Sequence, residues 1–248
     1  MTEDLLMIRR FLAFAIIISL CSCAKPNVPT PTASQATPTF PTKGWWHVRF
    51  KIFWPQDSRP RWWVDAAIAH EVINPILRNN KSNIELWRFH RRAARDKTGH
   101  QLSLLFYSSA MVADRVYEDI AANTFLQELL TEGIVVSVKY DDTSLVAMAG
   151  IGDTSDPNWA VEIQNSWPYF IMGASEMWLG TLNQITLEYQ KEHPFSSLDE
   201  KLEGYQDIYD SMVFLWQEQC GHALLHHLYA LYGYVPIKVR QVDMLMRF

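Results

Sequence analysis

The sequence predicts an α+β protein in which a ferredoxin-like βαββαβ half is followed by a mainly helical half. Three observations predict this class. Short runs of alternating apolar residues indicate strands, and longer runs with an apolar residue every three or four positions indicate helices. Through residue 140 these runs follow in the order strand, helix, strand, strand, helix, strand, which is that of a split βαβ sandwich. The first half covers residues 45–142 and the second covers residues 150–248.

The first half contains six predicted elements. Apolar residues alternate with Arg49 and Lys51 and predict a strand over 48–54. A helix is expected over 61–74, because apolar residues recur at helical spacing until Pro75 interrupts them. The remaining elements are strands over 84–89 and 102–107, a helix over 110–130 and a β-branched strand over 134–140.

The second half begins with a polar loop over 152–158. Helices are expected over 169–192 and 198–232, and an alternating tail over 235–242 predicts one more strand. No long linker separates the two halves, which favours a single globular domain over residues 45–248.

The composition is that of a foldable globular chain. Of the 248 residues, 48% are hydrophobic and 20% are charged, and the net charge is −5. These values exclude a disordered or collagen-like chain. The acidic balance argues against broad nucleic-acid binding, because a surface that follows phosphates usually carries a basic excess. No run of about 18 apolar residues is present, so no membrane-spanning helix is expected.

The N-terminus carries the features of an export signal. Arg9 and Arg10 precede an apolar run over 11–20, and a short processing site follows. That site, Leu20-Cys21-Ser22-Cys23, resembles the lipobox of bacterial lipoproteins. The resemblance implies a lipoprotein signal peptide over 1–22 and a diacylglyceryl group on Cys23, usually with a further N-linked acyl chain such as palmitate. An ordinary secretory signal that is cleaved near the same place is the alternative.

Acylation of Cys23 would anchor the protein in the bilayer of a bacterial cell envelope. Ala24 follows the cysteine and no aspartate stands there, which by resemblance to enterobacterial sorting favours the outer membrane, facing the periplasm. The segment 23–44 is rich in proline and threonine, cannot bury a core and is expected to be an extended tether. Cys220 is then left without a partner cysteine and is expected in the core.

Two histidines form the best candidate for a chemical site. His222 and His226 lie four residues apart in the last predicted helix, so both imidazoles reach one side of it, and Glu218 stands one turn earlier. This set suits a zinc ion and is the basis of an alternative function, a metal-dependent hydrolase. The spacing lacks the glutamate of an HExxH motif, so a pair of partly buried histidines without a metal is the simpler interpretation.

A second candidate site is a cluster of arginines at the predicted turn between the two central strands. Its members are Arg88, Arg91, Arg92 and Arg95. Guanidinium groups bind phosphates and carboxylates through paired hydrogen bonds, so the cluster predicts an anion-binding site. The alternative is a solvated turn whose cations pair with the protein's own carboxylates.

Adjacent tryptophans are the third feature, at Trp45 and Trp46 and again at Trp62 and Trp63. Successive residues of a strand point to opposite faces, so Trp45 and Trp46 cannot enter the same core. One of them is then available to stack on a sugar or to contact a partner, as part of an aromatic surface. Packing against the tether or the helical half is the alternative.

Motifs for nucleophilic catalysis and nucleotide binding are missing from the sequence. No serine stands in a GxSxG pattern, and there is no phosphate-binding glycine loop and no CxxC. The order Trp87-Arg88-Phe89, then Gly99-His100-Gln101-Leu102-Ser103-Leu104, is similar to a strand, loop and strand in the C-terminal domains of lantibiotic-dehydratase-like proteins. That family carries arginines where this chain has Gln101 and Ser103, so the resemblance implies a local fold and no activity.

The sequence therefore predicts a lipid-anchored binding or structural protein of the cell envelope that performs no chemistry and needs no cofactor. Its expected partners are the bilayer, through Cys23, and another envelope component. That component is an envelope protein, including a toxin that this protein neutralises, or a glycan; nucleic acid is not expected.

Overall fold

The computed structural model describes residues 42–235 of the protein. The predicted signal peptide, the lipidation site Cys23 and nearly all of the tether lie outside this range, as does the strand expected over 235–242 apart from its first residue. The described residues belong to one compact unit. Among the described residues, none of the helices combines the length and the apolar character that crossing a membrane requires.

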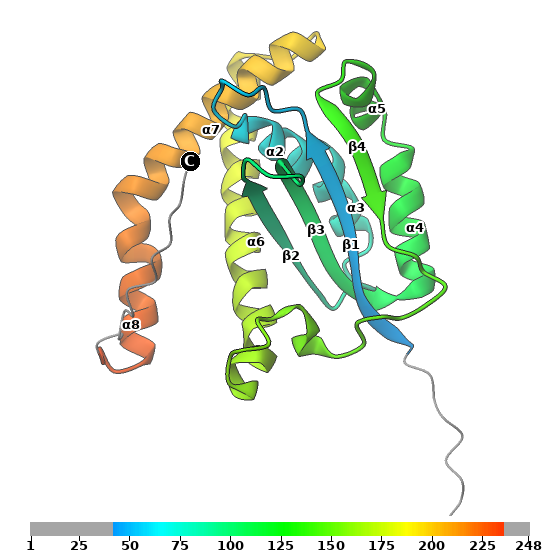
Figure 1. The fold of residues 1–248 in the computed structure, drawn as a ribbon. Coiled ribbons are helices and arrows are strands. Elements are labelled where there is room, and N and C mark those ends of the chain that lie inside the picture. Colours follow the sequence, from blue (N-terminus) through cyan, green and yellow to red (C-terminus); the bar gives the residue numbers. More distant parts are fainter. Residues whose placement is uncertain (1–41, 236–248) are drawn as a thin grey trace, which may run out of the picture. The chain divides into compact units, whose positions relative to one another are not determined.

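Four strands form one antiparallel sheet (Figure 1). They are β1 (Lys43–Ile52), β2 (Leu86–Ala93), β3 (His100–Ser109) and β4 (Val135–Tyr140), in the spatial order β2-β3-β1-β4. One face of the sheet carries the apolar residues of the alternating pattern and is covered by helices; its members in β1 are Trp46, Val48, Phe50 and Ile52. The α+β class predicted from the sequence is confirmed.

The first helical segment continues through Pro75, contrary to the prediction. α2 (Trp62–Ile68) runs into a π-helical turn, η1 (Ala69–Ile73), and then into α3 (Asn74–Asn79). A proline inside an α-helix clashes with the carbonyl four residues earlier. Here the N–H of Asn74 bonds the carbonyl five residues back, and this wider turn accommodates the proline ring that follows.

The single helix expected over 110–130 is two helices. α4 (Ala110–Ala121) is followed by α5 (Thr124–Thr131), with Asn123 between them. The side-chain oxygen of Asn123 accepts a hydrogen bond from the N–H of Leu126 at 3.0 Å, which is the geometry of a helix N-cap. The asparagine therefore starts a new helix at this point.

The second half is helical, as expected, with different boundaries. α6 (Val161–Glu192) begins well before the predicted start at 169 and lies along the free edge of β2. There Ser175 Oγ accepts a hydrogen bond from the N–H of Phe89 at 3.1 Å, so an unpaired strand donor is satisfied. The other elements are the 3₁₀ turn η2 (Ile151–Thr154), α7 (Leu198–Cys220), the π turn η3 (Gly221–His226) and α8 (His227–Leu231).

Only the first part of α7 belongs to the core. Its buried residues are Gly204, Tyr205, Ile208 and Met212. Cys220 lies two turns further on and is half-buried, so its predicted place in the core is wrong. The reason is that α7 leaves the core after Met212.

A polar contact fastens α7 to η1. The hydroxyl of the buried Tyr205 lies 2.6 Å from His70 Nδ1 and donates to Glu71 Oε1 at 2.5 Å. Burial alone would raise the pKa of Glu71, but hydrogen bonds from His70 and Tyr205 and the nearby Lys201 ammonium outweigh it and lower the pKa to about 2. The Glu71 carboxylate therefore stays ionised in the folded protein.

A buried ion pair joins the sheet to the helices. Asp65 of α2 is fully buried, and its Oδ2 accepts a hydrogen bond from Arg91 Nε of β2 at 2.9 Å. His100 Nε2 of β3 lies 3.0 Å from the other oxygen of Asp65, although its N–H is not aligned for a hydrogen bond. The Arg91 guanidinium lies between the rings of Trp62 and Trp178, 4.9 and 5.1 Å from their centroids.

We expect Asp65→Ala to lower the free energy of unfolding by about 3–5 kcal/mol, because it leaves the Arg91 charge without its partner in the core. Urea denaturation monitored by circular dichroism measures this change. Asp57→Ala, in an exposed loop, is the control and should change the free energy by less than about 0.5 kcal/mol. Equal effects of the two substitutions would contradict the assigned role of Asp65.

Candidate anion-binding face

The four arginines of the predicted cluster do not come together. Because side chains alternate along β2, Arg91 points into the core while Arg88 and Arg92 lie on the opposite face of the sheet. Arg95 lies in the turn after β2, and its guanidinium carbon is 3.4 Å from the centroid of the Trp54 ring. The prediction of one four-arginine site is therefore wrong, and only Arg88 and Arg92 share a surface.

The strand register combines these two arginines with cations from β1 and β4. Paired residues of neighbouring strands lie side by side on the same face, so rows can be followed across the sheet. The three rows are Arg88, Leu105 and His47; then His90, Ser103, Arg49 and Lys139; then Arg92, Gln101, Lys51 and Ser137. The basic members form what we call the cationic face: His47, Arg49, Lys51, Arg88, His90, Arg92 and Lys139.

The cationic face is the side of the sheet turned away from the helical layer, with α2 and α3 behind the strands in Figure 1. His90 and Lys139 are exposed. The side chains of Arg49 and Arg92 keep 34% and 36% of their surface accessible, while His47 keeps 14%. A ligand can therefore reach most of the charged groups.

Two carboxylates partly neutralise the five permanent cations. Asp141 Oδ1 accepts a hydrogen bond from Arg49 Nη1 at 2.7 Å, and its Oδ2 lies 2.7 Å from His47 Nδ1. Asp96 pairs with Arg92 at the end of the hairpin. The face keeps an excess of positive charge, although the whole chain carries a net charge of −5.

The histidines of the face are influenced by their cationic neighbours. Partial desolvation lowers the pKa of His90, and Arg88 and Arg92 lower it further. Burial also lowers the pKa of His47, which outweighs the hydrogen bond and attraction of Asp141. Both imidazoles are therefore neutral near neutral pH, and the positive charge there comes from the arginines and lysines.

One end of the cationic face is closed by a small apolar cluster that includes Trp45. Trp45 packs with Leu86 and Leu105, and its Nε1 donates to the Ile151 carbonyl at 2.9 Å. Trp46 points to the opposite face, as expected, and lies in the main core. Each tryptophan is only 2% exposed, so the predicted aromatic surface is wrong for this pair.

The second tryptophan pair also serves packing. The Trp62 ring meets the His100 ring edge-on, with centroids 4.8 Å apart. Trp63 is partly buried against the main core. Neither residue extends an exposed aromatic surface, so the packing alternative describes all four tryptophans.

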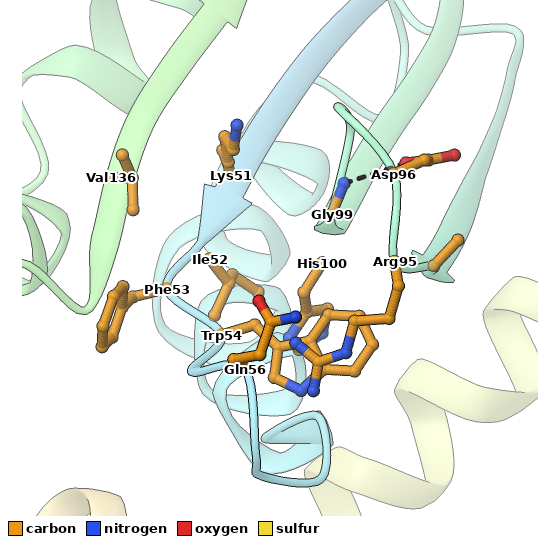
Figure 2. Close-up of a pocket in the computed structure, with 11 residues that line it drawn as sticks. Lys51, Ile52, Phe53, Trp54, Gln56, Arg95, Asp96, Gly99, His100 and Val136 are labelled. Atoms are coloured by element: carbon orange, nitrogen blue, oxygen red, sulfur yellow. Dashed lines mark hydrogen bonds between the residues drawn. The ribbon is translucent and has the colours of Figure 1, made fainter.

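At the other end of the face, a pocket of about 350 Å³ lies where β1 ends beside the β2–β3 turn (Figure 2). Lys51 and Arg95 contribute positive charge to its lining, and Asp96 contributes one negative charge. Phe53, Trp54 and Val136 contribute apolar surface. The pocket therefore continues the cationic face at Lys51 and adds an apolar wall to it.

The predicted metal ligands lie elsewhere, at the end of α7 and in η3. His222 and His226 are exposed, with their rings stacked and their centroids 4.9 Å apart, and Glu218 is also exposed. Within residues 42–235, no group of three or more His, Cys, Asp or Glu residues is arranged to hold a metal ion. The geometry of the described chain therefore gives the metal-dependent hydrolase no support.

Sequence reasoning missed His47, Arg49, Lys51 and Lys139. A signal for the first three was present, because they alternate with the apolar residues that predicted β1. Lys139 joins them only through the pairing of β1 with β4, which brings it beside Arg49.

Comparison with known proteins assigns no family to this chain. No family model matches it, and no curated protein matches it. Among solved structures it is similar to the crystal structure of TsrL, with 15% sequence identity and a TM-score of 0.33. The match covers 78% of this chain and 50% of TsrL, so the chain spans about half the length of that protein. A similarity at this level assigns no function.

Proposed function

We propose that this protein is a lipid-anchored binding protein of the bacterial cell envelope that holds an anionic partner on the cationic face of its sheet. The observation that carries the proposal is the placement of five permanent cations on one face of a sheet, in a chain that is acidic overall. The partner is an envelope component that carries carboxylates or phosphates.

The physical basis is short-range recognition by preorganised charge. Arg49 is held by Asp141 at 2.7 Å, and Arg88 donates to the Thr154 carbonyl at 3.3 Å. A ligand that meets guanidinium groups already in place loses less conformational entropy on binding. The net charge of −5 gives no long-range attraction for anions, so selectivity rests on direct contact with this face.

The N-terminal sequence supports the envelope part of the proposal. The lipobox Leu20-Cys21-Ser22-Cys23 provides the acylation site, and the proline-rich segment that follows provides the tether. Two or more acyl chains anchor a protein firmly, whereas one alone binds marginally. We place the protein on the periplasmic side of the outer membrane, because Ala24 follows the lipidated cysteine.

We also infer that the sheet and its first helices form a ferredoxin-like unit. The strand order β2-β3-β1-β4 with antiparallel neighbours supports this, as does the helix after β1 and the helices between β3 and β4. In this arrangement one face of the sheet is free of helices, which leaves it available for binding.

Reversing two charges of the cationic face tests anion binding. We expect Lys51→Glu with Arg92→Glu to weaken the binding of short poly-glutamate and of tripolyphosphate roughly tenfold or more, because attraction becomes repulsion. Isothermal titration calorimetry on the full-length protein in non-ionic detergent measures the affinity.

The matched control carries the same charge change away from the sheet, at Lys81 in the turn after α3 and at Arg115 of α4. Lys81 and Arg115 are exposed and lie away from the face, so Lys81→Glu with Arg115→Glu should bind like the wild type. Equal loss in the two double variants would mean that net charge alone drives binding, and no binding by the wild type would refute the proposed function.

Acidification should strengthen anion binding. The pKa values of His47 and His90 are lowered, so both imidazoles become protonated only at a pH below the ordinary pKa of histidine. A bound anion favours the protonated, charged form. We expect affinity for short poly-glutamate, whose carboxylates stay ionised in this range, to rise between about pH 7.5 and about pH 5.5. His47→Gln with His90→Gln should flatten this rise, and an unchanged profile in that variant would contradict the assignment.

The lipid anchor is tested separately. We expect Cys23→Ser to block incorporation of radiolabelled palmitate and to release the protein from membranes or leave its signal peptide uncleaved. Cys21→Ser is the control, because Cys21 lies within the predicted signal peptide. Palmitate incorporation into the Cys23→Ser protein would exclude Cys23 as the acylation site.

A further inference from the structure

The cations of the face stand in two columns, and their spacing indicates the shape of the ligand. One column lies on β2 and consists of Arg88, His90 and Arg92; the other lies on β1 and consists of His47, Arg49 and Lys51. Residues two apart in a strand are separated by about 6.6 Å, and strands lie about 4.8 Å apart. Because β3 lies between β1 and β2, the columns are about 10 Å apart.

Between the columns, β3 presents side chains without charge. These are Leu105, Ser103 and Gln101, of which Leu105 and Ser103 are buried. Gln101 Nε2 donates to Ser103 Oγ at 2.9 Å, which leaves the amide oxygen of Gln101 available to a ligand donor. Of these three, Gln101 is partly accessible and lies at the Lys51 end, so a ligand can contact β3 there while it meets the cations of the columns on either side.

An extended peptide has the same repeat as each column. Its alternate side chains point to one side and are also about 6.6 Å apart, so carboxylates at every second residue match successive cations. We propose that the cationic face docks an extended acidic segment of a partner protein, with Asp or Glu at alternating positions. This inference rests on the proposed anion-binding function and names its ligand class.

The two ends of the face give the segment a direction. The Trp45 end is closed by contacts with η2, whereas the Lys51 end continues into the pocket of about 350 Å³. The Arg95 guanidinium covers the Trp54 ring, so the open apolar side chains of that pocket are Phe53 and Val136, and they suit one apolar side chain at the end of the acidic run. The recognised segment is therefore a run of alternating carboxylates that ends in an apolar residue.

Charge argues against a polyphosphate backbone as the ligand. Binding to nucleic acid draws on a basic excess over the whole surface, and this chain carries a net charge of −5. Guanidinium groups such as those of Arg49, Arg88 and Arg92 form paired hydrogen bonds with carboxylates and with phosphates alike, so the oligothymidylate and vesicle measurements below distinguish the two ligand classes.

Two peptides of equal length and composition test this inference on the full-length protein in non-ionic detergent. One alternates Glu and Thr and ends in Phe, and the other has all Glu residues in one block before the Thr residues and the final Phe. Fluorescence anisotropy should give at least fivefold tighter binding for the alternating peptide, which is about 1 kcal/mol. Lys51→Glu with Arg92→Glu should abolish this preference, while Lys81→Glu with Arg115→Glu should keep it.

The possible results separate the inference from the function on which it rests. Equal binding of the two peptides refutes the extended acidic segment but leaves anion binding in place. Tighter binding of oligothymidylate of equal charge, or of phosphatidylglycerol vesicles, also refutes it. Failure of both peptides and of tripolyphosphate to bind refutes the proposed function itself. Self-association of the protein that the alternating peptide disrupts would make a second copy the occupant and refute a separate partner.

Discussion

The ion pair between Arg91 and Asp65 is the contact on which the arrangement of the sheet depends. A charged side chain is tolerated in a core only with a partner, and Asp65 accepts from Arg91 at 2.9 Å. Strand residues alternate, so fixing Arg91 inward also fixes Arg88, His90 and Arg92 outward. A shift of β2 by one residue would turn Arg91 to the outer face and bring Arg88, His90 and Arg92 into the core, where only one of them could pair with Asp65.

The same pair connects the sheet to three helices. Asp65 belongs to α2, and the Arg91 guanidinium also lies against Trp178 of α6 and Tyr209 of α7. The free energy gained in this packing supports a face on which like charges repel one another. That repulsion is reduced by Asp141, which holds Arg49 at 2.7 Å before any ligand arrives. Stability on one side of the sheet therefore allows charge to be concentrated on the other.

Local sequence predicted the strands and most helices because their apolar repeats are local properties. It failed where the deciding contact is not local. The cover over Trp45 comes from Ile151, which follows it by more than a hundred residues. The arginines were grouped because they are close in sequence, although side-chain alternation along β2 places Arg91 and Arg92 on opposite faces of the sheet. The cationic face needed the register of three strand pairs, which no single run of residues contains.

In the proposed lipoprotein, strand β1 would connect the lipid anchor to the cationic face. It begins at Lys43, directly after the proline-rich segment. Near this start, Trp45 packs with Leu86 and Leu105 and closes one end of the cationic face. Its last residues, Lys51 and Ile52, line the pocket at the other end. In the proposed lipoprotein the chain from the membrane therefore enters at the closed end, and a partner segment reaches the face from the open one. Lys43 and the pocket lie at opposite ends of β1, so an anchor that precedes Lys43 and a ligand that enters at the pocket would approach the sheet from different ends of the same strand.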